Sequence, residues 1–279
     1  MNGLEFSARG RRWRADIARP VDLAIPLDFA GPQPRFFAPS PAAAEPLRTG
    51  TFTGSVAAGA SCNCTTYTLA PHCHGTHTEC VGHVSEPVAS LAAITPAAPC
   101  LALLVSVTPR PLGAGALGPH AASDDRVIER LALEQAASAW LRDPWTALVL
   151  RTLPNLPDKR HRAYLDGPSP APYFDPDAIG WLVERGVTSL VVDLPSLDRA
   201  DDGGQLAAHR VFWGLPAGST DVAAATRPHA LVTELAFVPD AAGDGLYLLD
   251  LQVPAFVADA APSRPVLYRL TESTELRGA

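Results

Sequence analysis

The chain has 279 residues, 47% hydrophobic and 18% charged, with 22 basic against 29 acidic side chains and a net charge of −7. This composition excludes a disordered chain, and the mean hydropathy of +0.08 is too low for a membrane protein. The acidic balance excludes a partner such as nucleic acid, which needs a basic face.

The first hundred residues contain no segment that predicts export or a membrane span. Asp22, Pro26 and Asp28 interrupt the stretch after the N-terminal arginines, so no apolar signal-peptide run forms. Residues 88–107 carry no charge, but prolines interrupt them, so a membrane-spanning helix is not expected there. We expect this stretch to be a loop that leads into a buried strand.

The middle of the chain predicts a strand, a helix and a second strand in succession. Before this strand–helix–strand unit, an interrupted apolar stripe over 124–141 predicts another helix. Residues 146–150 are an apolar run typical of a strand, and Asp175 followed by proline is typical of a helix start. A glycine at 186 ends that helix, and 187–193 reads as a buried strand. This order predicts parallel pairing in an α/β sheet.

Three later segments, 231–238, 246–253 and 265–270, alternate or run apolar as strands do. We find no internal repeat and no low-complexity linker, so a single domain over 1–279 is the simplest organisation.

Four of the five cysteines lie within 19 residues, among histidines. An odd number in this setting favours reduced thiols or metal ligands over disulfides, and a cytoplasmic location follows as an expectation. A structural zinc site is the alternative, although the spacings lack paired C-x-x-C knuckles. It would use Cys62, Cys64, Cys73 and Cys80.

Half of the eight histidines fall in the run PHCHGTHTECVGH, residues 71–83. Imidazole, thiolate and carboxylate are the ligands of zinc and similar divalent ions, so this density predicts a metal site. If the run is extended, alternation places Cys73, His77 and Glu79 on one face, with His72 and His74 pointing away. His83 lies beyond that strand, where it could carry a proton.

These residues resemble the H-x-G-T-H-x-D-x-x-x-H signature of the putative cyclase family of metal-dependent hydrolases, which includes bacterial kynurenine formamidase and isatin hydrolase. Further segments follow in that family's order: ALVLRT, WLVERGVTSLVVDLPSLD, LAAHR and LVTEL. The resemblance covers roughly residues 20–270. It implies an α/β chain with the swivelling β/β/α fold, mixed sheets with flanking helices and a two-metal centre, assembled as a homodimer.

The resemblance also implies roles for single residues. His77 and Glu79 match metal ligands of the family, and His83 matches its catalytic acid/base. His209 in LAAHR and Glu234 in LVTEL match the more distant ligands. Asp193 and Ser196 match positions near the site, where we expect supporting hydrogen bonds.

Two departures distinguish this chain from the signature. Cys73 stands where the family has its first histidine ligand, so either its thiolate binds metal or, after a local shift, the imidazole of His72 or His74 takes its place. On the strand-parity argument we expect the thiolate to bind metal. Glu79 replaces an aspartate, which moves the carboxylate out by one methylene group. We expect two zinc ions per chain, with manganese as the second candidate.

The resemblance implies hydrolysis of a small-molecule amide or lactam, as in arylformamidases. A divalent metal would supply the attacking hydroxide, because it lowers the pKa of bound water from 15.7 toward about 7. The alternatives are a lactone hydrolase or cyclase on the same centre, or a non-catalytic protein with structural zinc.

Overall fold

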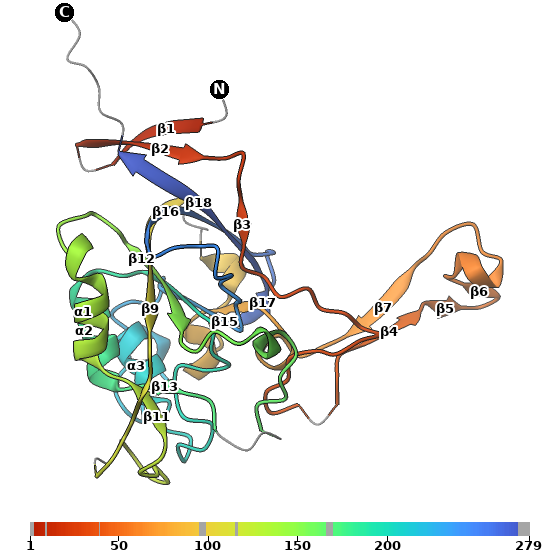
Figure 1. Ribbon diagram of the computed structural model, residues 1–279. Coiled ribbons are helices and arrows are strands. Elements are labelled where there is room, and N and C mark those ends of the chain that lie inside the picture. Colours follow the sequence, from red (N-terminus) through yellow and green to blue (C-terminus); the bar gives the residue numbers. More distant parts are fainter. Residues whose placement is uncertain are drawn as a thin grey trace, which may run out of the picture.

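Four parallel strands form the centre of the molecule (Figure 1): β9 (Cys100–Val107), β12 (Ala147–Thr152), β14 (Ser189–Val192) and β15 (Leu231–Glu234). The structure is a computed structural model that describes residues 3–8, 10–38, 40–94, 99–114, 117–165 and 170–272. Nearly all residues of these strands are buried, as in parallel sheets covered on both faces. The predicted parallel pairing is confirmed.

Antiparallel strands extend this centre on both sides into one mixed sheet, ordered β1-β2-β18-β16-β9-β12-β14-β15-β8-β17, with β3 paired to β18. One side consists of β16 (Gly245–Gln252), β18 (Arg264–Glu272), β2 (Arg11–Asp16), β1 (Gly3–Ala8) and β3 (Val21–Asp22). The other side consists of β8 (His77–Glu79) and β17 (Ala260–Pro262). The strands predicted over 246–253 and 265–270 are therefore present.

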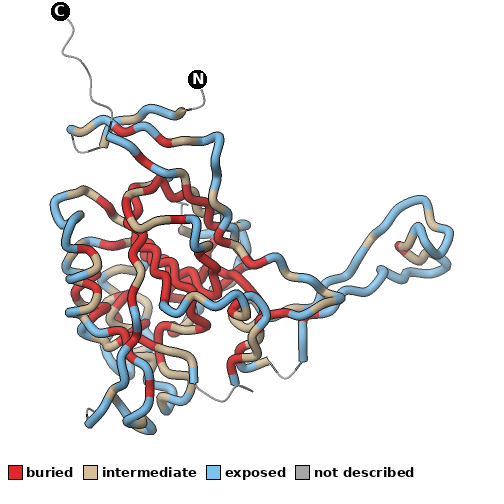
Figure 2. The backbone as a smooth tube through the Cα atoms, in the orientation of Figure 1, coloured by how far each residue is buried: buried red, intermediate tan, exposed pale blue. Residues whose placement is uncertain are grey.

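Three helices cover one face of the sheet: α1 (Arg130–Ala137), α2 (Pro176–Glu184) and α3 (Ala207–Trp213). Their buried side chains share one core with alternate residues of the central strands, such as Leu148 and Leu190. The remaining residues of those strands, such as Val149 and Val191, form a second core on the other face. Figure 2 shows this buried centre.

The start of α2 forms as the sequence predicts. The carboxylate of Asp175 accepts a hydrogen bond from the amide of Asp177 at 2.9 Å, and Pro176 occupies the first turn, where no amide is needed. Gly186 has φ of 78°, the left-handed conformation that glycine tolerates after a helix.

The predicted start of the preceding helix is wrong. Instead of beginning at residue 124, α1 begins at Arg130, and β11 (Arg126–Ile128) precedes it. This strand pairs with β10 (Arg110–Pro111) and β13 (Tyr173–Phe174). The buried carboxylate of Asp125 accepts hydrogen bonds from Tyr173 at 2.9 Å and Arg199 at 2.8 Å, and these tertiary contacts outweigh the local helical pattern.

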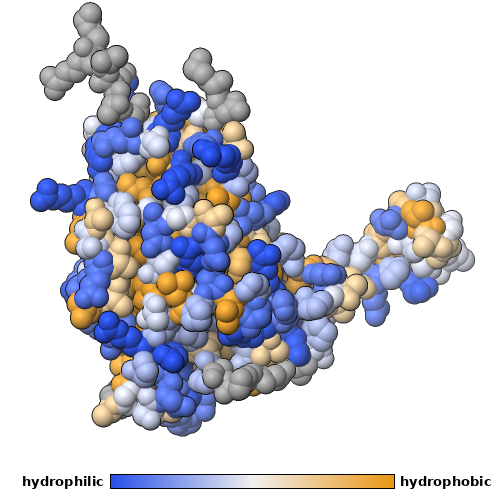
Figure 3. Space-filling model, viewed as in Figure 1, coloured by the Kyte–Doolittle hydropathy of each residue, from blue (hydrophilic) through white to orange (hydrophobic). Residues whose placement is uncertain are grey.

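A two-stranded arm extends away from the body between β3 and β8 (Figure 1). It pairs β4 (Ala43–Pro46) with β7 (Thr65–Thr68), and β5 (Arg48–Thr49) with β6 (Phe52–Thr53). Figure 3 shows hydrophobic residues at its tip.

Short 3-10 helices lie in several loops: Val56–Ala58, Pro71–Cys73, Val81–Val84, Leu91–Ala93, Ser138–Trp140, Pro157–Arg160 and Val222–Ala224. The uncharged stretch over 88–107 becomes a loop followed by β9, as expected, although residues 95–98 lie outside the described part of the chain. Among the described helices, none has the length and apolar character needed to cross a membrane.

The chain's single lysine forms a buried ion pair at the carboxyl ends of β12 and β14. Lys159 Nζ lies 2.7 Å from Asp193 Oδ2 and donates to the carbonyl of Thr152 at 2.7 Å. The Thr152 amide donates to the same Asp193 oxygen at 2.8 Å. Burial raises the pKa of Asp193 above its usual value, and the charge of Lys159 opposes that rise. The pair therefore joins β12 to the end of β14.

Lys159→Met should lower the free energy of unfolding at pH 8 by about 3–5 kcal/mol, because it leaves a buried carboxylate without its cation. Without that cation the pKa of Asp193 rises further above its unfolded value, so the carboxyl group binds a proton as the pH falls and the loss becomes smaller at pH 5. Urea unfolding at both pH values measures this difference. The control is Lys159→Met with Asp193→Asn, which should recover part of the loss; an equal loss in both variants would contradict the ion-pair explanation.

Candidate metal centre

Strand β8 places two predicted ligands beside a third on the neighbouring strand. It pairs antiparallel with β15, so that His77 is opposite Glu234 and Glu79 is opposite Val232. Because side chains alternate along a strand, His77 and Glu79 project from the same face, with Glu234 beside them. Val232 belongs to the core under the helices, so this face is the one that α3 covers.

Helix α3 supplies His209 from above that face. Asp198 lies upstream and accepts hydrogen bonds from the amides of Ala208 at 2.7 Å and His209 at 3.1 Å. The same carboxylate lies 2.6 Å from His209 Nδ1. Asp198 thus anchors the start of the helix and leaves Nε2 of His209 directed at the acidic residues of the sheet.

The four side chains converge in the interior. Nε2 of His209 lies 2.9 Å from Glu79 Oε1 and 3.2 Å from Glu234 Oε1, and His77 Nε2 lies 3.5 Å from Glu234 Oε2. The Nε2 atoms of His77 and His209 and both carboxylate oxygens of Glu79 are buried without a partner at hydrogen-bonding geometry. Unpartnered buried polar atoms are costly and rare, and four of them facing one another are what a cation would satisfy.

The first ligand position differs from the expectation. Residues Pro71–Cys73 form a 3-10 helix, and Gly75 has φ of 101°, so the run is extended only from His77 to Glu79. The strand-parity argument is therefore wrong for Cys73. Among the described residues, Cys73 belongs to no group of potential metal ligands.

His72 points into the site instead of away from it. Its Nδ1 lies 2.9 Å from Glu79 Oε2, and its Nε2 lies 2.8 Å from Asp259 Oδ2. His74 does point away, as expected: its Nε2 lies 2.9 Å from the carbonyl of Ser40.

Three overlapping groups of potential ligands result, and in each the ligand atoms lie within 4.8 Å of one another. The two inner groups share Glu79. They are His72, His77 and Glu79, and Glu79, His209 and Glu234. The outer group is His72, His83 and Asp259, all partly exposed.

His83 lies at the edge of the inner groups, on the 3-10 helix Val81–Val84. Its ring centroid is 4.4 Å from that of His72 and 5.5 Å from that of His209. The side chain is 27% exposed, and its Nδ1 is 3.7 Å from Glu79 Oε2. His83 is thus close to the buried groups and still open to solvent, as a group that exchanges protons must be.

Electrostatics in the cluster are dominated by the excess of carboxylates. Burial lowers the pKa of His72, but the hydrogen bond to Asp259 and the negative charge of Glu79 outweigh it and raise that pKa to about 10. Burial also opposes the charged form of His209, yet Glu79 and Asp198 hold its pKa well above the usual value. The pKa of Glu79 lies well below its usual range despite burial, because of the charges on His83 and His209. Such a site favours added positive charge.

The sequence patterns assigned no role to two residues of this site, although Asp198 ends the family segment WLVERGVTSLVVDLPSLD. Asp198 lies ten positions or more before the amides and ring it binds, and Asp259 is 187 residues from His72. Of the residues expected to support the site, Ser196 accepts a hydrogen bond from the Asp198 amide at 3.2 Å. Asp193 instead binds Lys159 and Thr152.

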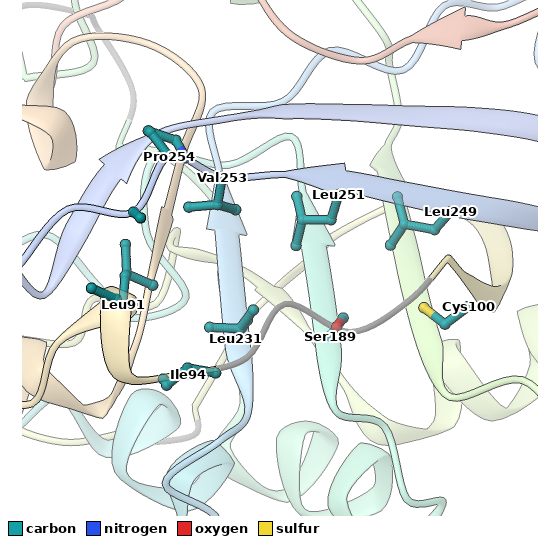
Figure 4. A pocket seen from close by; sticks show the side chains of 11 residues that line it. Leu91, Ile94, Cys100, Ser189, Leu231, Leu249, Leu251, Val253 and Pro254 are labelled. Carbon is teal, nitrogen blue, oxygen red and sulfur yellow. The ribbon is translucent and has the colours of Figure 1, made fainter.

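A separate cavity of about 80 Å³ lies at the amino ends of the central strands (Figure 4). Ser189 and Leu231 begin β14 and β15 there, whereas Glu234 is at the other end of β15. Its lining is almost entirely apolar and contains no member of the three ligand groups. It is therefore distinct from the candidate metal centre.

A family model and several solved structures match this chain. The family model described as "Putative cyclase" matches residues 21–199. That span includes His72, His77 and Glu79 but ends before His209 and Glu234. No curated protein matches the sequence.

Solved structures match along nearly the whole chain. Isatin hydrolase A from Ralstonia solanacearum is 18% identical with a TM-score of 0.59, covering 91% of this chain and 92% of that one. A predicted metal-dependent hydrolase from Bacillus stearothermophilus is 15% identical with a TM-score of 0.56, covering 90% of this chain and 98% of that one. Isatin hydrolase A from Labrenzia aggregata is 18% identical with a TM-score of 0.57, covering 90% and 93%. These likenesses confirm the predicted mixed α/β fold.

Asp198→Asn should weaken binding of one divalent ion by about 10-fold, because the neutral amide oxygen accepts the Nδ1 proton of His209 more weakly than the carboxylate does. Zinc titration of the metal-free protein by calorimetry measures the change. The matched control is Asp202→Asn, since Asp202 accepts the amide of Leu206 at 2.6 Å in the same loop without touching a histidine ring. Equal weakening in both variants would mean that only the loop is perturbed.

Proposed function

The chain belongs to the putative cyclase family, and from this membership we propose that it is a metal-dependent hydrolase of a carbon–nitrogen amide or lactam bond other than a peptide bond. One observation carries the proposal: two groups of three ligands share the buried carboxylate of Glu79. Its Oε2 faces His72 and its Oε1 faces His209, so a single side chain serves both groups.

The residues fit two divalent ions. His72, His77 and Glu79 would hold one, and Glu79, His209 and Glu234 would hold the other. Imidazole and carboxylate donors suit zinc and also manganese, and without a thiolate the site has no soft donor that would favour zinc strongly. Zinc remains the first candidate and manganese the second.

Bound metal would supply Lewis acidity, which polarises a carbonyl and makes water more acidic near neutral pH. The protein supplies the proton transfers. His83 is near the ligands and 27% exposed, so it can accept a proton from the attacking water and return it to the departing nitrogen. Imidazole suits both steps because its unperturbed pKa lies near neutral pH.

The neighbours guide the choice of substrate class. One structural match is an isatin hydrolase bound to the product analogue thioisatinate, and isatin contains a lactam. We propose a small-molecule amide or lactam, with aryl formamides as the first substrates to test. Family folds host several substrates, so turnover has to decide among them.

Two other functions use the same residues. A lactone hydrolase or cyclase would employ the same centre, and comparing the turnover of formanilides, isatin-like lactams and lactones separates these activities. A structural zinc protein is the remaining alternative, but no cysteine enters a ligand group among the described residues, and His83 is left outside the inner groups. Unfolding on chelation without any hydrolysis would favour that alternative.

The metal-loaded protein should contain two divalent ions per chain, because five inner ligands exceed the number that one tetrahedral ion takes. Elemental analysis after dialysis against zinc, and separately against manganese, measures this number. A single ion under both conditions would contradict the two-metal proposal.

His83→Ala should keep both ions and the fold while lowering kcat by about 10²- to 10⁴-fold, the usual contribution of a general acid/base. His77→Ala should instead lose metal. His120→Ala is the control, since His120 is exposed, pairs with Asp201 at 2.8 Å and lies outside the ligand groups. Loss of metal from His83→Ala would make His83 a ligand and contradict this division of roles.

A further inference from the structure

Asp259 brings a carboxylate to the ligands from the C-terminal part of the chain. It directly precedes β17, which pairs antiparallel with β8 so that Ala260 is opposite Glu79. The carbonyl of Asp259 also accepts a hydrogen bond from the amide of Cys80 at 3.0 Å. Backbone pairing therefore fixes Asp259 beside the strand that carries His77 and Glu79.

The carboxylate of Asp259 holds one nitrogen of the His72 ring. Nε2 of His72 donates to Asp259 Oδ2 at 2.8 Å, while Nδ1 lies 2.9 Å from Glu79 Oε2. An imidazole whose Nε2 carries the proton has its lone pair on Nδ1. Once a metal ion replaces the proton on Nδ1, this contact would leave the lone pair of His72 directed toward Glu79.

The other two histidines of the inner groups are also held through one ring nitrogen, which is Nδ1 in both. Nδ1 of His77 lies 3.0 Å from the carbonyl of Gly75, and Nδ1 of His209 lies 2.6 Å from Asp198 Oδ2. Each presents Nε2 to the acidic residues. A ligand histidine nearly always donates its second ring nitrogen to a carboxylate or carbonyl, which fixes the tautomer and orientation of the ring.

We propose that Asp259 is the positioning residue that makes His72, instead of the adjacent Cys73, a metal ligand through Nδ1. The proposal rests on the metal centre proposed above. The 3-10 helix Pro71–Cys73 presents neighbouring side chains in different directions, so the local backbone does not by itself select a ligand. Of the two, His72 has the carboxylate that holds it in place.

Zinc titrations of the metal-free full-length protein test this role. Asp259→Ala should weaken the binding of one of the two ions by about 10- to 100-fold and leave the affinity for the other ion unchanged. Asp259→Asn should lose less, because its amide oxygen still accepts the His72 proton. In a His72→Ala background, Asp259→Ala should have no further effect. Asp201→Asn is the control, since it alters an equivalent aspartate–histidine pair with exposed His120.

Two spectroscopic readouts separate positioning from a general structural effect. Long-range ¹H–¹⁵N correlation of the zinc-loaded protein should show His72 with the proton on Nε2, and His77 and His209 with the proton on Nδ1. Cobalt-substituted protein should lack the near-ultraviolet thiolate-to-cobalt band. That band should emerge in His72→Ala if Cys73 then takes the ligand position, and it should disappear in His72→Ala with Cys73→Ser.

Several results would overturn the proposal. Unchanged affinity in Asp259→Ala, or a loss that persists in the His72→Ala background, would remove the positioning role while the metal centre stands. A thiolate band in the unsubstituted protein would assign the ligand role to Cys73. A third ion that Asp259→Ala abolishes would make Asp259 a ligand. Failure of the unsubstituted protein to bind any ion would reject the metal centre and this role together.

Discussion

The burial of the Glu79 carboxylate is the constraint on which the rest of the site depends. The side chain is fully enclosed between β15, β17 and α3, and neither oxygen has a hydrogen bond. A carboxylate without water or partners costs several kcal/mol, so positive charge has to be supplied next to it. His72 and His209 bring their ring nitrogens to within 2.9 Å of its two oxygens, and divalent ions are the stronger source of compensating charge.

Hydrogen bonds to one nitrogen of each imidazole ring decide which nitrogen is left to bind a metal ion. The carbonyl of Gly75 and the carboxylates of Asp198 and Asp259 each contact one ring nitrogen of a histidine in the inner groups. The other ring nitrogen of each histidine is then available to the acidic residues or to a metal ion. A second buried carboxylate in the molecule shows the contrast. Asp193 Oδ2 accepts from Lys159 and from the amide of Thr152, so its charge is compensated by the protein and it serves the fold. The two acids therefore differ: a lysine of the protein compensates the charge of Asp193, whereas neither oxygen of Glu79 has a hydrogen-bond partner.

Much of the fold follows from local patterns, since the buried strands and the start of α2 depend on apolar runs and on the pair Asp175 and Pro176. The pattern fails where tertiary contacts compete with it. The apolar pattern predicts a helix over residues 124–129, but the carboxylate of Asp125 accepts hydrogen bonds from Tyr173 and Arg199, which lie far along the chain. The strand predicted over 231–238 is likewise shorter, since β15 ends at Glu234. Leu235 adopts φ of 52°, and its amide donates to the carbonyl of Leu194 at 2.8 Å.

The sequence by itself determined where the histidines and carboxylates of the candidate metal centre lie along the chain, because they fall in residues 71–83 and in the segments around His209 and Glu234. Only the tertiary structure decided which neighbour, His72 or Cys73, faces the site. Strand alternation holds only for extended backbone, and the 3-10 helix together with the positive φ of Gly75 rotates the side chains out of that register. The partner that secures His72 is Asp259, which directly precedes β17 and lies 187 residues along the chain. Pairing over such a distance leaves no local sequence pattern.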